Sequence, residues 1–592
     1  MSFDPPATPG PRWSRISRGA LASPLLLAAL GTGLAVATGG AAHAATCPSS
    51  TTTRVAASGG AVAYSYVRGC ITSFDGTPIV YNLFEPTGAS ARHRVYAVLE
   101  GPGWGGAGNT TPDNNLLKAD YAYLTWDPRG FGQSGGVAEV DSPLSEGRDV
   151  SALITDVLGS RPEIAVDTDR RDSTYGQPAV GMLGASYGGG IQLSSAAFDR
   201  RIKAIVPEWA WNNLDYSLYP GGNIKLGWDE LLFGAGLAES GAAHAATVTG
   251  GTAGTQTGGY DPNIYRSEVA GLAEGYPDQQ TLGWFGQRSM ASWGGGRDGH
   301  VPDVPTLLVQ GTVDTLFNLD EAWANWNMIH KADPKNPVKM IAFCGGHVSC
   351  PTGNGYSDTP RTGFEKGVPD STFIENAAIN WYDVYLRHDR GAKDTLPTVL
   401  GQDQAGTWHA LTSFPTAAGP GGATLTKTAL SGTVLSTGVP TGTGPNSSID
   451  PAVTDGASPS GDPGTLTVAL ITHAKADTLI AGEPHIALTV TVDGPSTGLF
   501  FKLVDVATNQ VVDLQTASYR LDNTDLPNNA NNPNLPPAAE KVSLDMVGVV
   551  YDLPKGDSLE LQVSTSAAPF TPNRGASVVS LSGSLLLPTF QG

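Results

Sequence analysis

Short apolar runs, separated by loops and by longer helical stretches, recur between Cys70 and about Phe343. The first two runs, residues 70–73 and 79–84, flank Asp75-Gly76, a dipeptide typical of a hairpin turn. The later runs stand alone and indicate buried central strands; they cover residues 95–99, 121–126, 180–183, 202–206, 306–310 and 338–343. Their alternation with helical stretches predicts βαβ units and a mostly parallel sheet.

The strand pattern stops between Pro207 and Val304, where tryptophan, glycine and helical fragments such as residues 228–238 take over. We interpret residues 207–304 as an inserted helical cap. A helix near residues 371–387, with apolar residues at mostly helical spacing, should close this α/β domain.

After about Pro397 the chain becomes rich in Thr, Ser, Gly, Pro and Asn. Short alternating runs in this part predict a β-sandwich or jelly roll; they cover residues 465–471, 485–492, 499–506 and 558–563. Residues 440–464 read as a long loop. The expected organisation is therefore an α/β domain over residues 46–395 and a β-sandwich over residues 396–592.

The N-terminus has the pattern of a secretory signal. Three arginines, Arg12, Arg15 and Arg18, precede an apolar run at residues 25–36. Mostly small residues follow the run and end in Ala42-His43-Ala44, which has the A-x-A form of a cleavage site. The apolar core is short and broken by glycine, unlike a transmembrane anchor. We expect residues 1–45 to be a signal peptide, cleaved near Ala44 or Ala45, and the protein to be secreted without stable membrane insertion.

Composition narrows the classes of partner. The 592 residues carry 35 Lys and Arg against 55 Asp and Glu, for a formal charge of −20, and no basic stripe is evident. Nucleic acid is therefore not an expected partner.

The four cysteines, an even number in an exported chain, suggest disulfides. Three pairings are open, of which the local pairs Cys47–Cys70 and Cys344–Cys350 are the most economical. The spacing of these cysteines does not suggest zinc, and the sequence implies neither a metal nor a cofactor.

The strongest chemical signal is Gly184-Ala185-Ser186-Tyr187-Gly188-Gly189-Gly190, directly after the run at residues 180–183. A serine between glycines at a strand-to-helix turn is a nucleophile elbow, in which small neighbours allow the strained backbone to present the hydroxyl. Ser186 is the expected nucleophile.

A serine nucleophile needs a base and an orienting carboxylate, which in this type of sheet follow in the order acid, then histidine. Asp314 lies on the loop after the run at residues 306–310, and His347 lies in a glycine-rich loop after the run at residues 338–343. We expect Ser186, Asp314 and His347 to form a catalytic triad. A disulfide between Cys344 and Cys350 would restrain the histidine loop.

The oxyanion of a tetrahedral intermediate needs two donors. One is expected from the backbone amide of Tyr187, the residue after the nucleophile. The second is expected from the glycine-rich loop at residues 100–108, through the backbone of Gly103 or Trp104.

Gly130-Phe131-Gly132-Gln133-Ser134-Gly135 formally matches a dinucleotide-binding fingerprint. No helix is predicted to open on it, and a six-residue match is weak in a chain with 75 glycines. We interpret the string as structural, with Asp127 and Arg129 pairing near the active-site floor.

These motifs together resemble the X-prolyl dipeptidyl peptidase and cocaine esterase family of α/β hydrolases. The resemblance rests on residues 126–135, residues 184–189, Asp314 and His347, and on residues 501–506 of the tail, and it covers about residues 70–592. It implies an α/β-hydrolase core with an inserted helical cap and a C-terminal jelly roll, acting as a serine hydrolase on amides or esters.

One departure concerns the oxyanion hole. Members of the family often use a tyrosine hydroxyl as second donor, whereas the matching Gly101-Pro102-Gly103-Trp104 has no tyrosine. The same loop is also similar to that of proline iminopeptidase-like hydrolases, so the subfamily stays open.

Three functions are considered, with a small peptide or ester as substrate of the first two. A dipeptidyl peptidase is slightly favoured over an acyl esterase; it would need an anion for the substrate's ammonium group, for which Glu208 and Asp215 are candidates. Trp209, Trp211 and Trp228 are candidates for an apolar pocket wall. The third function, a non-catalytic surface-binding protein, is disfavoured by the intact triad. The oligomeric state is not predicted.

Overall fold

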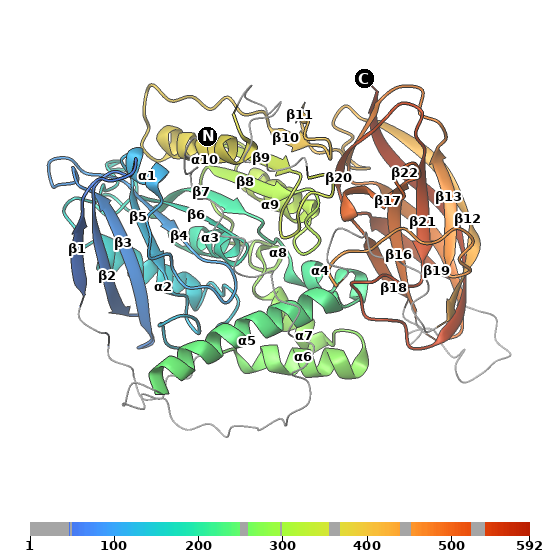
Figure 1. The fold of residues 1–592 in the computed structure, drawn as a ribbon, viewed down its shortest axis with the longest axis horizontal. Coiled ribbons are helices and arrows are strands. Elements are labelled where there is room, and N and C mark those ends of the chain that lie inside the picture. Colours follow the sequence, from blue (N-terminus) through green and yellow to red (C-terminus); the bar gives the residue numbers. More distant parts are fainter. Residues whose placement is uncertain are drawn as a thin grey trace, which may run out of the picture. The chain divides into compact units, whose positions relative to one another are not determined.

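An eleven-stranded sheet organises the first part of the chain (Figure 1). The structure is a computed structural model that describes residues 47, 50–248, 259–295, 299–353, 368–437, 452–495, 497–521 and 539–591, all within one unit, Ala44–Gly592. The spatial order is β1-β2-β3-β5-β4-β6-β7-β8-β9-β10-β11. The strands are β1 (Thr51–Val55), β2 (Tyr64–Thr72), β3 (Pro78–Pro86), β4 (Ala97–Glu100), β5 (Ala122–Trp126), β6 (Val180–Ala185), β7 (Ile202–Glu208), β8 (Thr306–Gly311), β9 (Val338–Phe343), β10 (Val399–Gln402) and β11 (Trp408–Leu411).

The pairing confirms the predicted mixture of strand directions. β2 and β3 form an antiparallel hairpin, and β3 also pairs antiparallel with β5. From β5 across to β10 the strands run parallel. The sheet continues past residue 395, where the α/β domain was expected to end, because β10 pairs with β9 and β11 pairs with β10.

Both faces of this sheet are covered. Leu308 packs on one face with α2 (Glu146–Ala152), the π-helical turn Leu153–Leu158, α3 (Tyr187–Phe198) and α9 (Leu319–Ala332). Its neighbour Leu307 packs on the other face with α1 (Asn114–Lys118) and α10 (Asp370–Tyr385). Because successive side chains of a strand point to opposite faces, a strand covered on both sides is apolar throughout. This explains the uninterrupted apolar runs of the sequence.

Between β7 and β8 the described residues contain helices and no strand, as predicted for the cap. The elements are α4 (Leu214–Leu218), the 3-10 turn Pro220–Gly222, α5 (Leu226–Val248), α6 (Pro262–Glu274), α7 (Gln279–Gly286) and α8 (Met290–Trp293). Figure 1 shows α5, α6 and α7 side by side below the sheet.

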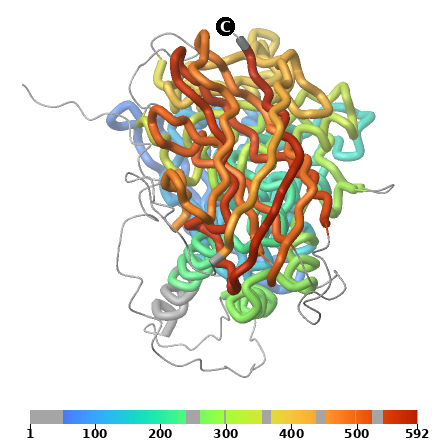
Figure 2. Tube along the Cα trace, turned by 90° about the vertical axis from the view of Figure 1, so that its right-hand side faces the viewer, coloured from blue at the N-terminus to red at the C-terminus, as the bar shows by residue number. Residues whose placement is uncertain are grey.

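Two antiparallel sheets follow (Figure 2). They share one apolar core. One has the order β19-β15-β22-β14-β20, with β12 on β22; the other has the order β13-β21-β16-β17, with β18 on β16. The strands are β12 (Thr424–Thr437), β13 (Thr465–Ile471), β14 (Thr478–Gly482), β15 (His485–Asp493), β16 (Thr497–Asp505), β17 (Gln510–Val511), β18 (Ala517–Leu521), β19 (Ala539–Asp545), β20 (Val549–Leu553), β21 (Leu559–Ser564) and β22 (Ala576–Gln591). The predicted β-sandwich is confirmed.

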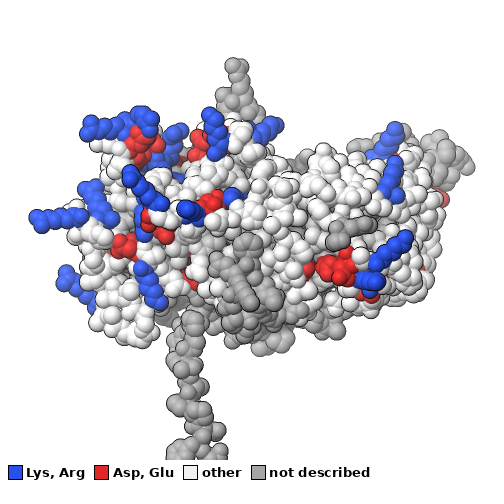
Figure 3. Space-filling view, turned by 90° about the horizontal axis from the view of Figure 1, so that it is seen from above, with Lys and Arg blue, Asp and Glu red and all other residues white. Residues whose placement is uncertain are grey.

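Some predictions fall outside the described residues. The signal peptide at residues 1–45 does, as do residues 440–451 of the predicted loop at residues 440–464. No helix among the described residues is long and apolar enough to cross a membrane. Basic and acidic side chains lie interspersed on the face seen in Figure 3.

Candidate active site

Ser186 lies at the turn between β6 and α3, with a backbone φ of 60°. A non-glycine residue in this region is strained and persists only when its surroundings enforce it. Here the Ser186 amide donates to Glu208 O on β7 (2.9 Å). A Cβ on Gly188 would overlap with Gly101 O, and one on Gly189 would overlap with Glu208 O. The glycines of the motif therefore allow α3 to begin tightly against the neighbouring strands.

The structure brings the three predicted triad residues together. His347 Nε2 lies 2.8 Å from Ser186 Oγ, and His347 Nδ1 lies 2.7 Å from Asp314 Oδ2. Asp314 is completely buried in the turn after β8. A histidine that donates from Nδ1 to this carboxylate has Nε2 free to accept the serine proton. The arrangement can activate Ser186 as a nucleophile.

Three aromatic rings and a disulfide surround His347. The rings of Trp209, Trp228 and Phe317 lie edge-on to the imidazole, with centroid distances of 5.5, 5.8 and 5.3 Å. A disulfide joins Cys344 to Cys350 across the loop, and the second expected disulfide joins Cys47 to Cys70. The side chain of His347 is only 14% exposed, so the ring is confined to a mainly apolar environment.

Ser186 and Tyr187 line a cavity whose other walls come largely from the cap. Most of its wall is apolar or aromatic, with Trp104, Trp211, Phe233, Phe285 and Phe317 among the lining residues. The cavity also contains two carboxylates, Asp229 from α5 and Glu268 from α6. A pocket with apolar walls and a few polar groups is the usual form of a small-molecule site.

Both cavity carboxylates have raised pKa values. Burial raises the pKa of Asp229 well above its ordinary value, with repulsion from Glu268 adding to the effect. Burial together with repulsion from Glu230 raises the pKa of Glu268 to about 7. Two acids close to each other in an apolar site favour a cationic ligand, because it would relieve both desolvation and repulsion.

The residues expected to bind substrate are distributed differently. Trp211 lines the cavity, whereas Glu208 and Trp209 are absent from its described lining, as are Asp215 and Trp228. Glu208 ends β7, where burial and the nearby Glu100 raise its pKa to about 8. The acidic groups that share the cavity with Ser186 are Asp229 and Glu268, which the sequence analysis missed.

The predicted oxyanion donors lie at the start of α3 and on the glycine-rich loop at residues 101–108. Tyr187 is the first residue of α3, where backbone N–H groups have no partner within the helix. Trp104 lines the cavity and packs edge-on against Tyr187 at 5.1 Å, while its indole N–H donates to Leu232 O of the cap. Gly103 O accepts the amide of Gly106. The second donor, Gly103 N or Trp104 N, stays a prediction.

The glycine-rich string at residues 127–136 has a structural role, but its expected ion pair is wrong. Arg129 binds Asp149 through Nε and Nη2, both at 2.7 Å, and also Asp75 at 3.1 Å. Asp127 instead accepts the amides of Gly108 and Gln133. Asp127 and Arg129 therefore each bind other segments of the chain and do not pair with each other. No group of three or more His, Cys, Asp or Glu side chains suited to a metal occurs among the described residues.

Comparisons with known proteins agree with this geometry. Residues 75–349 match the family described as X-Pro dipeptidyl-peptidase (S15 family), and residues 391–578 match its C-terminal non-catalytic domain. An uncharacterized 31.7 kDa protein of Escherichia coli is 32% identical over 102 residues, 17% of this chain. The chain spans about a third of the length of the curated relatives that it matches.

Several solved structures share the fold across both domains. An α-amino acid ester hydrolase superposes with a TM-score of 0.62 at 14% identity, covering 96% of this chain and 100% of that one. An aminopeptidase from a marine sediment Thaumarchaeota archaeon gives a TM-score of 0.61 at 14% identity, covering 89% and 97%. A CocE/NonD family hydrolase from Staphylococcus aureus gives 0.56 at 14% identity, covering 89% and 94%.

Proposed function

Since the chain belongs to the S15 X-Pro dipeptidyl-peptidase family, we propose that it is a secreted serine peptidase that removes short N-terminal fragments from peptides with a free α-amine. The observation that carries the proposal is one cavity that contains the hydroxyl of Ser186 and the carboxylates of Asp229 and Glu268. The reactive group and two acids that could bind an ammonium group therefore line the same pocket.

The triad supplies the chemistry. Ser186 Oγ attacks the carbonyl carbon of the scissile bond while its proton passes to His347 Nε2, 2.8 Å away. Asp314 orients the imidazole and stabilises its positive charge. The oxyanion is bound by Tyr187 N and by the Gly103 or Trp104 amide. His347 then gives the proton to the leaving group, and water activated by the same histidine hydrolyses the acyl-enzyme.

The cap selects the substrate's amino end. A primary or secondary ammonium placed between Asp229 and Glu268 gains two charge-assisted contacts in an apolar setting. The rings of Trp211, Phe285 and Phe317 give the rest of the fragment an apolar wall suited to a proline ring. A blocked amine would leave the two acids without a counter-charge. The same apolar wall suits a simple acyl group, and an acyl esterase is therefore the alternative function.

The first test assays the secreted mature protein and Ser186→Ala on Gly-Pro anilide, on its N-acetylated form and on a short-chain aryl ester. We expect cleavage of the free-amine anilide and at least 10-fold weaker cleavage of the blocked form. Ser186→Ala should reduce both to at most the roughly 10³–10⁴-fold acceleration over water that the oxyanion hole and binding supply. Ester cleavage without anilide cleavage would establish the esterase instead. Serine-independent activity, or none, would refute both.

A second test concerns the two cavity acids. Asp229→Asn and Glu268→Gln should each lower kcat/KM for the free-amine anilide by about 10- to 100-fold, which corresponds to about 1.4–2.8 kcal/mol. Activity on the aryl ester should change less than 3-fold. Glu274→Gln, an exposed acid at the end of the same helix as Glu268, is the matched control. Equal losses on both substrates would contradict amine recognition by these acids.

A further inference from the structure

The loop that carries Asp314 is contacted by a side chain of the β-sandwich. This acid loop, residues 312–317, connects β8 to the start of α9. Gln515 Nε2 donates to Thr312 O at 2.8 Å and to Asp314 O at 3.0 Å. Gln515 is 5% exposed and follows the 3-10 turn Val512–Leu514. One side-chain amide of the C-terminal domain thus binds the carbonyl of Asp314 itself and the carbonyl two residues before it.

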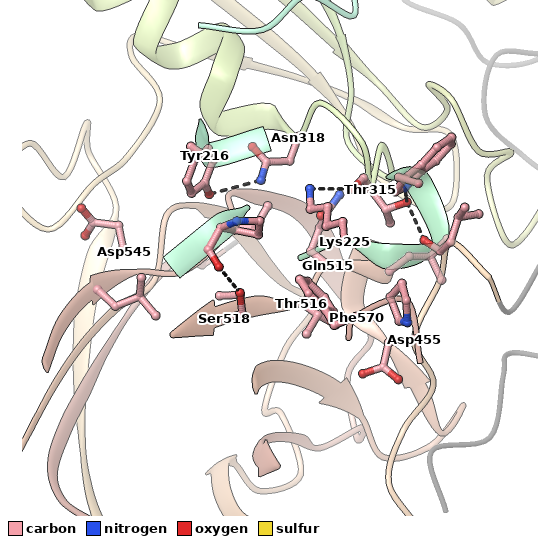
Figure 4. A pocket seen from close by; sticks show the side chains of 18 residues that line it. Tyr216, Lys225, Thr315, Asn318, Asp455, Gln515, Thr516, Ser518, Asp545 and Phe570 are labelled. Atoms are coloured by element: carbon pink, nitrogen blue, oxygen red, sulfur yellow. Dashed lines mark hydrogen bonds between the residues drawn. The ribbon is translucent and has the colours of Figure 1, made fainter. Parts of the chain in front are cut away.

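A second donor reaches the same loop from the cap. Lys225 Nζ donates to Thr315 O at 2.7 Å and to Leu316 O at 3.0 Å. In Figure 4 a dashed line joins Lys225 to Thr315, with Gln515 labelled beside them. Lys225 is 5% exposed. Its burial lowers its pKa to about 8, an effect that the charge of Asp314 opposes.

These contacts complete the support of the acid loop. On its inner side, Asp314 Oδ1 accepts the amides of Leu316 and Phe317, and Oδ2 accepts Nδ1 and the amide of His347. From the other two parts of the fold, Gln515 and Lys225 together donate to four backbone carbonyls of the loop. These are the carbonyls of residues 312, 314, 315 and 316. The direction of the Asp314 side chain therefore depends on donors from two other parts of the fold.

The two residues before Gln515 have an unusual backbone conformation. Asp513 and Leu514 have φ values of 49° and 58°, a region that non-glycine residues adopt only when tertiary contacts enforce it. Asp513 Oδ2 accepts the Val550 amide, and Leu514 is 1% exposed in the same apolar cluster as Phe317. Packing on both sides of the boundary between the domains thus directs Gln515 toward the acid loop.

We propose that Gln515 and Lys225 are positioning residues for Asp314, so that the β-sandwich supplies part of the order of the active site. The inference rests on the proposed function, because it requires Asp314 to orient His347 during catalysis. Neither side chain contacts the reacting atoms. Each holds backbone carbonyls of the acid loop, and loss of either lets the carboxylate turn away from Nδ1.

The test compares Gln515→Leu and Lys225→Met with Ser518→Ala. Ser518 Oγ makes a hydrogen bond across the same boundary, to Pro220 O at 2.6 Å, outside the acid loop. Because displacement by about 1 Å can cost about 100-fold in rate, we expect kcat to fall about 10- to 100-fold in each positioning variant. KM should stay within 2-fold. Ser518→Ala should keep kcat within 2-fold of wild type. Melting curves establish the folded fraction to which each rate is normalised.

A double-mutant cycle separates positioning from general destabilisation. In an Asp314→Asn background the further change Gln515→Leu or Lys225→Met should alter the residual kcat by less than 2-fold, because the group that it positions is already lost. A structural role would lower the rate in both backgrounds. Lys225→Met keeps the apolar stem of the side chain and removes the desolvation cost of a buried ammonium, so it serves if Gln515→Leu does not fold.

The outcomes separate the two proposals. If wild type shows no Ser186-dependent hydrolysis and a fluorophosphonate does not label Ser186, the proposed function fails and this inference with it. If wild type is active, and the variants match Ser518→Ala or lose the same factor in the Asp314→Asn background, the positioning role alone is overturned. A kcat loss confined to the native Asp314 background supports it.

Discussion

At the scale of single residues, the nucleophile helix packs against buried acids that do not belong to the triad. Glu146 Oε1 accepts the amide of Glu139 and the hydroxyl of Tyr187, the residue after the nucleophile. Burial raises the pKa of Glu146 to about 8, although the nearby Arg129 opposes this shift. Asp141, which is also buried, has its pKa raised well above the ordinary value by burial and by Glu146.

This acid pair makes stability depend on pH. A carboxyl whose pKa is raised by folding does not lower the free energy of unfolding at pH values below its pKa in the unfolded chain. As pH rises from there toward its pKa in the folded protein, the carboxyl lowers the free energy of unfolding more and more. The protein should therefore lose stability between about pH 5 and 8. Glu146→Gln keeps the acceptor oxygen and removes the charge. The difference in free energy of unfolding between this variant and wild type should therefore shift in favour of the variant between pH 5 and pH 8. We expect a shift on the order of 1–3 kcal/mol.

Urea unfolding at several pH values measures this difference. Glu274→Gln is the control, because that side chain is exposed and its removal should give the same small change at both pH values. A Glu146→Gln effect that is independent of pH would mean that the carboxyl is ionised in the folded protein across this range, as it is in the unfolded chain, and would contradict the raised pKa.

At the scale of elements, helix α5 joins the cap to the C-terminal domain. It carries Trp228, whose indole donates to Thr315 Oγ1 on the acid loop, and Asp229 in the substrate cavity. Gly227, one residue earlier, lies directly against Ala452 O. A side chain at this position would displace the start of α5 and, with it, two groups of the proposed site.

Gly227→Ala should therefore destabilise the protein, contrary to the rule for helices. Replacing a helix glycine by alanine ordinarily stabilises by about 0.5–1 kcal/mol, whereas a methyl group forced against backbone costs about 1–3 kcal/mol. We expect a lower melting temperature for Gly227→Ala and an equal or higher one for Gly283→Ala on α7, where a Cβ meets nothing within 4 Å. Equal shifts in both variants would contradict the close contact.

At the scale of the whole molecule, the candidate active site is assembled from three parts of the chain. The sheet places Ser186, Asp314 and His347 at the carboxyl ends of parallel strands, where ligand sites form in such folds. The cap encloses the cavity and contributes its acids. The β-sandwich contacts the acid loop through Gln515. The domain that matches the non-catalytic part of the family is thus in direct contact with the catalytic part.

The sequence by itself determined the central strands of the first sheet, the cap, the β-sandwich and the positions of Ser186, Asp314 and His347. These features depend on local signals, because an apolar run, a glycine elbow and a polar residue just after a strand are each readable within about ten residues. In a parallel sheet those strand ends meet at one edge, so local signals suffice to bring the triad together.

Only the tertiary structure decided which acids face the cavity and what holds the catalytic carboxylate. Asp229 and Glu268 are two among 55 acidic residues, and nothing in their neighbourhood in the sequence distinguishes them from exposed ones. The contact of Gln515 with Asp314 O joins residues 201 positions apart. Arg129 likewise binds Asp149, although Asp127 is closer to it in the sequence. Such contacts depend on the direction of side chains and on packing between distant segments. The pattern of apolar and polar residues along the chain gives no information on either.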